Sequence, residues 1–352
     1  MAGPVSVAAT RIAYGATQLP RLAWYVGQGM IMRELARRQA GERASAAPTA
    51  GASSLGNRQL YASIARLLRR DLANVEAGIY PLPADHDGSL LTLLQRSRLF
   101  FADLPVVHRR RERRGTREVA TQDNAGKRPD YYLQNFHFQS GGWMTRDSAR
   151  RYDTQVEVLF RGTANVIRRQ ALPPLPAVLA GRDQRALRFL DVGCGTGRFL
   201  NFFKQSWPRL PALGLDLSDA YIVEARHHLK DWGWLDLAVG KGEAMPVARE
   251  SLDAAASVFL FHELPPKVRR AVLAEFARVL KRGGRLVLVD SLQLGDEPDY
   301  DTMLERFPHS FHEPYYASYL KEDFAALATA SGLTHVRDVN AFIAKVMVFD
   351  KM

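Results

Sequence analysis

A glycine-rich turn between an apolar strand and a helix is the feature that most constrains how this chain can fold. Residues 187–197 read LRFLDVGCGTG, with three glycines at alternate positions directly after a run rich in apolar residues. Because glycine has no Cβ, such a turn lets a ligand approach bare backbone at the end of a strand. The segment therefore predicts a strand-turn-helix unit that binds a nucleoside-type cofactor, and the alternative is a plain tight turn.

The sequence around this turn predicts a sheet. After about residue 186, short apolar segments alternate with amphipathic ones, which is the pattern of a parallel, doubly wound α/β sheet. The last two apolar segments are separated by almost nothing, so we expect them to pair as an antiparallel hairpin. Strands are predicted at residues 186–193, 212–217, 235–241, 253–260, 285–291, 334–342 and 344–351, and helices at 198–204, 220–230, 266–280 and 321–331.

Two acidic residues sharpen the interpretation of the turn. The glycine spacing is GxGxG, and Asp191 stands two residues before Gly193. A carboxylate there would repel a pyrophosphate but suits a cofactor that bears an ammonium and a sulfonium. The second strand ends at Asp216, one strand-helix-strand step later, where a carboxylate is placed to accept both ribose hydroxyls.

These residues resemble a known family, the class I S-adenosylmethionine-dependent methyltransferases. LDVGCGTG is similar to the family's first motif, GLDLS to its second-strand acidic motif, and LKRGGRLVLVD to the segment that opens its fifth strand. The resemblance covers roughly residues 186–352. It implies a Rossmann-like methyltransferase sheet with a terminal antiparallel hairpin, and S-adenosyl-L-methionine as cofactor. GEAMPVARESLDAAASVFLFHEL is similar to the branch that includes ubiquinone/menaquinone C-methyltransferases and sterol or small-molecule methyltransferases.

The resemblance also implies the residues that hold the cofactor. They are Asp191, Gly193 and Gly195 for the methionine end, with Cys194 and Gly197 in the same loop, Asp216 for the ribose, Leu217 for the adenine face, Gly242 and Glu243 for the ring border, and Val258 and Phe259 beneath the methionine. One position departs from the family, which usually has an acid for the adenine amino group where this chain has Lys241. Lysine offers no acceptor, so that contact must come from backbone or from Glu243.

The N-terminal half of the chain lacks the strand-helix alternation of the C-terminal half, and its sequence suggests two further regions. We assign residues 1–56 to a basic amphipathic segment and linker, 57–180 to a mainly helical accessory or lid region, and 181–352 to the cofactor-binding domain. Residues 1–33 contain three arginines and no acid, with apolar residues between them. They predict either a helix docked on its own protein or an interfacial membrane helix, with an organellar transit peptide as a third alternative.

Several segments of the accessory region have distinct patterns. Helices are predicted at 57–76, at 89–102 with an end at the Leu104–Pro105 step, and at 146–170. Six arginines lie between residues 109 and 117, a run that is usually solvated and otherwise suits an anionic lipid or a nucleic acid. Few aromatics interleave with it, which argues against stacking on bases. Residues 131–143, YYLQNFHFQSGGW, are unusually aromatic and predict a lid over the cofactor.

Candidates for acceptor chemistry follow the fourth strand and lie in the insert before the last helix. The predicted catalytic residues are His262, Glu263, His309, His312 and Tyr316. A histidine can accept a proton near neutral pH, whereas the structural alternative for His262 is a cap on the strand end. The insert could wall an acceptor pocket or merely pack on the sheet. Pro308 and Pro314 argue against a regular helix there and favour the pocket.

The histidines lack the spacing of a familiar metal site, so no metal is predicted. The single cysteine, Cys194, excludes an internal disulfide and indicates a reducing compartment. Every long apolar run is interrupted by a charge before it could span a bilayer. We expect a cytoplasmic location, with peripheral attachment to a membrane as an alternative. The net charge of +11 favours anionic surroundings, such as lipid headgroups, nucleic acid or an acidic partner, and does not choose among them.

The sequence as a whole predicts an enzyme that transfers a methyl group from S-adenosylmethionine by in-line displacement. Its acceptor partner is expected to be a small hydrophobic molecule of quinone, sterol, polyketide or lipid type, with an anionic membrane surface as a second partner and no nucleic acid. One alternative is an RNA or protein methyltransferase that uses the arginine-rich segment. The other is a non-catalytic protein that keeps the fold, against which the intact glycine turn and Asp216 argue.

Overall fold

A single seven-stranded sheet organises the C-terminal half of the chain in the computed structural model, which describes residues 4–41 and 56–352 except 86, 123 and 125. The strand order is β3-β2-β1-β4-β5-β7-β6. β1 to β5 run parallel, and β7 is antiparallel to both of its neighbours. The strands are β1 Phe189–Val192, β2 Ala212–Asp216, β3 Leu235–Val239, β4 Leu252–Val258, β5 Leu280–Ser291, β6 Leu333–Ala341 and β7 Ala344–Lys351. The predicted fold class, including the terminal hairpin, is confirmed.

Helices cover the sheet as expected for a doubly wound fold. α7 lies beside α8, and α9 lies beside α12. Every residue of β1 and β4 is buried, which is typical of central parallel strands that are covered on both faces. The helices of this half are α7 Arg198–Ser206, α8 Asp219–His228, α9 Pro266–Val279, α10 Pro298–Ser310, α11 Tyr316–Tyr319 and α12 Phe324–Ala330.

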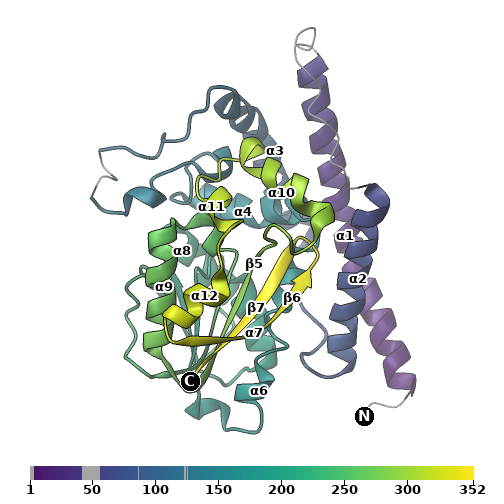
Figure 1. The fold of residues 1–352 in the computed structure, drawn as a ribbon. Coiled ribbons are helices and arrows are strands. Elements are labelled where there is room, and N and C mark those ends of the chain that lie inside the picture. The colour runs from purple at the N-terminus through teal and green to yellow at the C-terminus, as the bar shows by residue number, and fades with distance from the viewer. Residues whose placement is uncertain (1–3, 42–55, 86, 123, 125) are drawn as a thin grey trace.

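Six α-helices come from the N-terminal half of the described chain and pack against this sheet layer. They are α1 Pro4–Gly41, α2 Asn57–Glu76, α3 Leu90–Glu112, α4 Arg146–Leu159, α5 Ala164–Arg169 and α6 Pro176–Leu179. In Figure 1, α1 (purple) runs beside α2, and its C-terminal end projects beyond the rest of the ribbon. The predicted linker at 40–57 falls largely outside the described residues.

The first part of α1 is docked on the protein through buried polar contacts. The hydroxyl of Tyr14 donates to Asp71 Oδ2 at 2.7 Å, and the side chain of Arg21 pairs with Asp87 at 2.7 Å and with Glu157. Of the alternatives for residues 1–33, these contacts favour a docked helix. Further along α1, Ile31 is exposed. None of the helices that the structure describes is both long and apolar enough to cross a membrane.

Two predictions based on proline are wrong. α3 does not end before Pro105 but continues through it to Glu112, and α10 contains Pro308. A proline removes one backbone hydrogen bond from a helix, and packing can compensate for that loss. In α3 the buried ring of Phe100 packs with Tyr25 and Val158, so tertiary contacts hold the helix together near the proline.

The helix predicted at 146–170 is two helices with a sharp turn between them. Arg161 and Gly162 both have positive φ, 55° and 82°, and separate α4 from α5. A Cβ on Gly162 would lie 3.1 Å from the Cα of Leu22, so the turn brings its backbone against α1. The carbonyl of Gly162 accepts a hydrogen bond from Arg21 at 2.6 Å. The helix period of the sequence does not reveal this contact because its partner lies far away in the chain.

Candidate active site

The glycine turn has a backbone that only glycine adopts without strain. Gly193, Gly195 and Gly197 have φ values of 73°, 54° and 81°. A Cβ on Gly197 would lie 2.5 Å from Leu229 Cδ1, and one on Gly193 would lie 3.0 Å from Leu260 Cδ2. Gly197 caps α7 and allows close packing, whereas Gly193 and Gly195 line two adjoining cavities.

Asp191 is buried at the end of β1 with its carboxylate unsatisfied. The residue is 1% exposed, and neither carboxylate oxygen has a hydrogen-bond partner among the described residues. Burial, together with the nearby charge of Asp216, holds the pKa of Asp191 well above its usual range. A buried carboxylate of this kind is stabilised by a cation, so its position fits the ammonium of a methionine group.

Asp216 is fixed at the end of β2 by backbone donors. Its Oδ2 accepts from the N–H of Gly195 at 2.8 Å, and its Oδ1 accepts from the N–H of Ser218 at 2.8 Å. The carboxylate lines a cavity of about 90 Å³ together with Leu217, Gly242 and other residues. Each of these oxygens keeps a lone pair, so the carboxylate remains able to accept from ribose hydroxyls.

The aromatic segment 131–143, predicted to form a lid, contributes side chains to the wall of this cavity. Tyr131, Tyr132 and Trp143 line it. The hydroxyl of Tyr131 donates to Glu243, with distances of 2.9 and 3.0 Å to its two carboxylate oxygens. The segment therefore contacts the residue that the sequence places at the border of the adenine ring.

The accessory helix α4 reaches the glycine turn directly, which the sequence does not reveal. Asp153 accepts from Thr196 Oγ1 and from Arg198 Nε, both at 2.7 Å. Although burial opposes ionisation, Arg198 and His228 hold the pKa of Asp153 below its usual range. Tyr152, the preceding residue, lines the cavity beneath the lid. The helical spacing of apolar residues in α4 predicts a buried face, but it does not indicate which residues contact the cofactor loop.

A second cavity of about 230 Å³ adjoins the first. Tyr152, Phe259 and Glu263 line both cavities, so they form the boundary between them. The second cavity is walled mainly by apolar side chains, among them Val156, Leu159, Phe160, Leu304, Phe307 and Ile343.

The predicted catalytic residues are only partly brought together. His262, Glu263 and Tyr316 line the second cavity. His312 instead places its Nε2 2.8 Å from Gln134 Oε1 and is not among the lining residues. The side chain of His309 lies outside the described part of the chain.

All but one of the predicted cofactor residues line the first cavity or the small cavity of about 20 Å³ beside it, and the exception is Gly197. Val258, Cys194 and Asp191 border the smaller one. The burial of Cys194 raises the pKa of its thiol well above the usual range, which fits a structural position in the loop.

His262 forms a buried pair with an acid that the sequence analysis did not single out. Its Nδ1 lies 2.6 Å from Asp290 Oδ1, and Asp290 also accepts from the backbone N–H of Phe261 and of Ser291. Burial lowers the pKa of His262, but Asp290 outweighs it and raises the value to about 9. Asp290 ends the motif LVLVD, so its place after a strand was the available signal.

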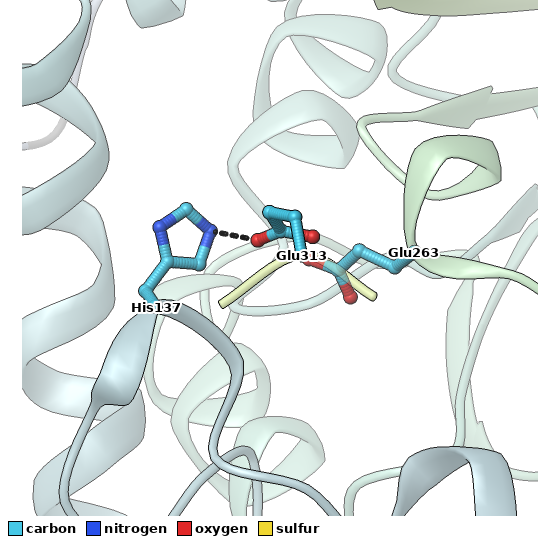
Figure 2. A group of neighbouring side chains, drawn as sticks. All are labelled: His137, Glu263 and Glu313. Carbon is cyan, nitrogen blue, oxygen red and sulfur yellow. Dashed lines mark ion pairs between the residues drawn. The ribbon is translucent and has the colours of Figure 1, made fainter. Parts of the chain in front are cut away.

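A second titratable cluster lies at the wall of the larger cavity. His137, Glu263 and Glu313 come from three distant segments and converge (Figure 2), and His137 Nε2 lies 2.8 Å from Glu313 Oε1. One ligand atom of each lies within 4.8 Å of the others. Sequence spacing cannot reveal such a group because no two of its members are near in the chain.

Comparison with known proteins agrees with this geometry. Residues 189–284 match the model of a family described as a methyltransferase domain. The chain is 30% identical over 165 residues to the ubiquinone/menaquinone biosynthesis C-methyltransferase UbiE of Methylobacterium nodulans, which covers 46% of this chain and 63% of that relative. This part of the chain is a class I S-adenosylmethionine-dependent methyltransferase domain. The predicted family and its cofactor are confirmed.

The chain is also similar to an O-methyltransferase and to a solved structure of low sequence identity. The malonyl-[acyl-carrier protein] O-methyltransferase of Methylococcus capsulatus is 36% identical over 99 residues, which are 28% of this chain and 35% of that relative. Among solved structures, YcgJ of Bacillus subtilis is 24% identical with a TM-score of 0.38, covering 49% of this chain and 70% of that one. The chain spans less than two thirds of the length of both curated relatives.

Replacing Asp191 by asparagine should weaken the binding of S-adenosylmethionine to the full chain by about 10- to 100-fold, the value of a charged hydrogen bond. Isothermal titration calorimetry measures the change. Asp236→Asn, on an exposed position of β3, serves as the matched control and should bind like the wild type. Equal affinity of Asp191→Asn and wild type would show that Asp191 does not hold the cofactor.

Proposed function

We propose that the protein transfers the methyl group of S-adenosylmethionine to a small hydrophobic acceptor held in the 230 Å³ cavity. The observation that carries this proposal is the boundary that the two cavities share, formed by Tyr152, Phe259 and Glu263. A methyl group presented at this boundary would face the acceptor directly. Alignment of acceptor, methyl and sulfur supplies most of the catalysis that such a displacement needs.

The residues of the domain divide the work of binding the cofactor. The bound cofactor supplies a methyl group on a sulfonium. Asp191 would pair with its ammonium, and Asp216 would accept from its ribose hydroxyls. The aromatic faces of Tyr152 and Phe259, at the boundary, would stabilise the positive sulfur. The lid segment 131–143 would exclude water from the reacting groups.

The acceptor is proposed to place its reacting head in the second cavity. The volume is below the range of about 300–1,000 Å³ that is usual for sites of drug-sized ligands, so it suits a ring-sized head better than a large molecule. The apolar lining favours acceptors of quinone, sterol, polyketide or lipid type. The relative from Methylobacterium nodulans is named for ubiquinone and menaquinone biosynthesis, which supports the quinone class.

Two of the six arginines in the arginine-rich segment make contacts within the protein, which leaves fewer of them for a nucleic-acid or protein substrate. Arg110 donates to the carbonyl of Phe138 in the lid and pairs with Glu118, and the guanidinium of Arg111 lies 5.8 Å from the centre of the Phe311 ring. These two arginines therefore contact the lid and the insert. They connect parts of the protein, whereas a nucleic-acid or protein methyltransferase would need them to bind its substrate.

Incubation of the full chain with isotopically labelled S-adenosylmethionine and a cell extract tests the proposal. The label should enter the fraction that organic solvent extracts, and mass spectrometry of that fraction should identify the methylated acceptor. A matched reaction without the protein gives the background. Label found only in RNA or protein would overturn the choice of acceptor, and no label in any fraction would overturn the activity.

We propose that His262, whose Nδ1 lies 2.6 Å from Asp290 Oδ1 beside the cavity, donates a hydrogen bond to the acceptor as an imidazolium. His262→Asn should lower kcat with the extracted acceptor by about 10-fold or more, the value of a lost charge-assisted hydrogen bond. The affinity for S-adenosylmethionine should stay within about 2-fold, since the side chain does not line the cofactor cavity. His335→Asn, on β6, is a control that should keep full activity. Unchanged kcat in His262→Asn would contradict the role.

We further propose that the projecting part of α1 contacts an anionic membrane surface. Ile31 and Leu35 are exposed there, as are Arg33 and Arg37, so apolar and basic groups share one exposed stretch. The double variant Ile31→Asp, Leu35→Asp should lose co-flotation with vesicles that contain phosphatidylserine. Point substitutions are preferable to truncation because the first part of α1 is docked in the protein. Equal flotation of variant and wild type would contradict the proposed membrane contact.

A further inference from the structure

We propose that His137, Glu263 and Glu313 bind one divalent transition-metal cation at the wall of the acceptor cavity. The three side chains face one another from the segment 136–138, from the turn after β4 and from the segment after α10 (Figure 2). The site is distinct from the cofactor-binding turn.

The distances within the cluster suit three ligands of one ion. His137 Nε2 and Glu313 Oε1 are 2.8 Å apart, and one ligand atom from each residue lies within 4.8 Å of the others. Bonds of about 2.0–2.2 Å to nitrogen and oxygen keep the ligands of one cation within about 4 Å of each other. A small inward rotation of the Glu263 side chain would therefore complete the site.

The second observation is the unsatisfied burial of Glu313. Its side chain is 0% exposed, and neither carboxylate oxygen has a hydrogen-bond partner among the described residues, where its ion-pair partner is the imidazole of His137. A second carboxylate, Glu263, lies beside it. The side chain of Glu263 is only 16% exposed, and two ionised carboxylates this close in a buried site repel each other. A cation between them would remove this repulsion.

The donor set and its surroundings favour a particular class of ion. One imidazole and two carboxylates are typical ligands of Zn²⁺, Mn²⁺ or Fe²⁺, whereas Mg²⁺ and Ca²⁺ prefer oxygen alone. Trp143 Nε1 donates to Glu263 Oε2 at 3.1 Å, which orients that carboxylate. Its Oε1 lies 3.9 Å from His262 Nε2, too far for a hydrogen bond, so this oxygen could bind the ion. His137 and Glu263 both line the 230 Å³ cavity, so the remaining coordination positions open toward the acceptor.

The role of the ion rests on the proposed function, although its binding does not. In the acceptor cavity a three-coordinate cation would take an oxygen of the acceptor as a further ligand. The acceptor would then carry a hydroxyl, enol or carbonyl oxygen near the atom that receives the methyl group. This narrows the hydrophobic acceptors proposed above to those with an oxygenated head.

Metal binding is measured on the full chain after chelator treatment, by titration with Zn²⁺ and Mn²⁺ and by the visible absorption of Co²⁺. Wild type should bind one equivalent of ion, and the visible spectrum of Co²⁺ should change in intensity and position from that of the aqueous ion. Glu313→Gln should weaken binding by at least about 10-fold. Glu305→Gln, an exposed position of α10, is the matched control and should bind as wild type does. His137→Gln, with the same expected loss, replaces Glu313→Gln if that variant does not fold.

Circular dichroism and titration with S-adenosylmethionine accompany each variant, so that failure of the two proposals can be told apart. Wild type that binds S-adenosylmethionine but none of the three ions would overturn the metal site and leave the methyltransferase proposal standing; the cluster would then be a buried ion pair with a protonated Glu263. Ion binding that neither Glu313→Gln nor His137→Gln weakens would also overturn it. Ion binding without cofactor binding would support the site and count against the proposed function.

Discussion

The buried carboxylate of Asp153 holds the cofactor turn and the accessory helices in one arrangement. It accepts from Thr196 within the turn and from Arg198 at the start of α7. Arg198 also donates to the carbonyl of Asp85, in the segment between α2 and α3. A paired charge that is buried this deeply cannot lose its partner without a large cost. The shape of the cofactor turn therefore depends on helices that precede it by more than forty residues.

The same helices connect the turn to α1. Arg21 of α1 pairs with Glu157, one turn of α4 beyond Asp153, and Arg169 of α5 pairs with Asp71 of α2 at 2.6 Å with both side chains buried. The Arg21–Glu157 pair crosses the boundary that the sequence suggests between an N-terminal segment and an accessory region, and the Arg169–Asp71 pair joins two helices within the accessory region. The N-terminal helices are thus part of the framework that positions the cofactor site, whatever surface the far end of α1 contacts.

What the sequence predicts well is local. The glycine turn, the order of strands and helices and the hairpin depend on periodicity and on glycine, so they can be read from neighbouring residues. Asp191 and Asp216 could be predicted as cofactor-binding carboxylates because each stands near the end of a predicted strand. The predicted end of a helix at Pro105 was wrong because tertiary packing stabilises the helix by more than the loss of one backbone hydrogen bond destabilises it. The roles of Asp290 and Glu313 could not be predicted, because each contacts a histidine that is distant in the sequence and no neighbouring residue indicates that contact.

The two cavities differ in how many of their lining residues lie within the range that matches the family. The matched residues 189–284 include most of the cofactor cavity. Among the described residues that line the 230 Å³ cavity, only Phe259, His262 and Glu263 lie within that range. The others come from α2, the segment 136–138, α4 and the turn after it, the end of β5, the C-terminal insert and the turn between β6 and β7. Proteins that share the methyltransferase domain can therefore share its cofactor while differing in almost every residue that touches the acceptor. If the proposed function holds, selectivity for the acceptor would depend mainly on segments outside the family match, which also supply His137 and Glu313 of the proposed metal cluster.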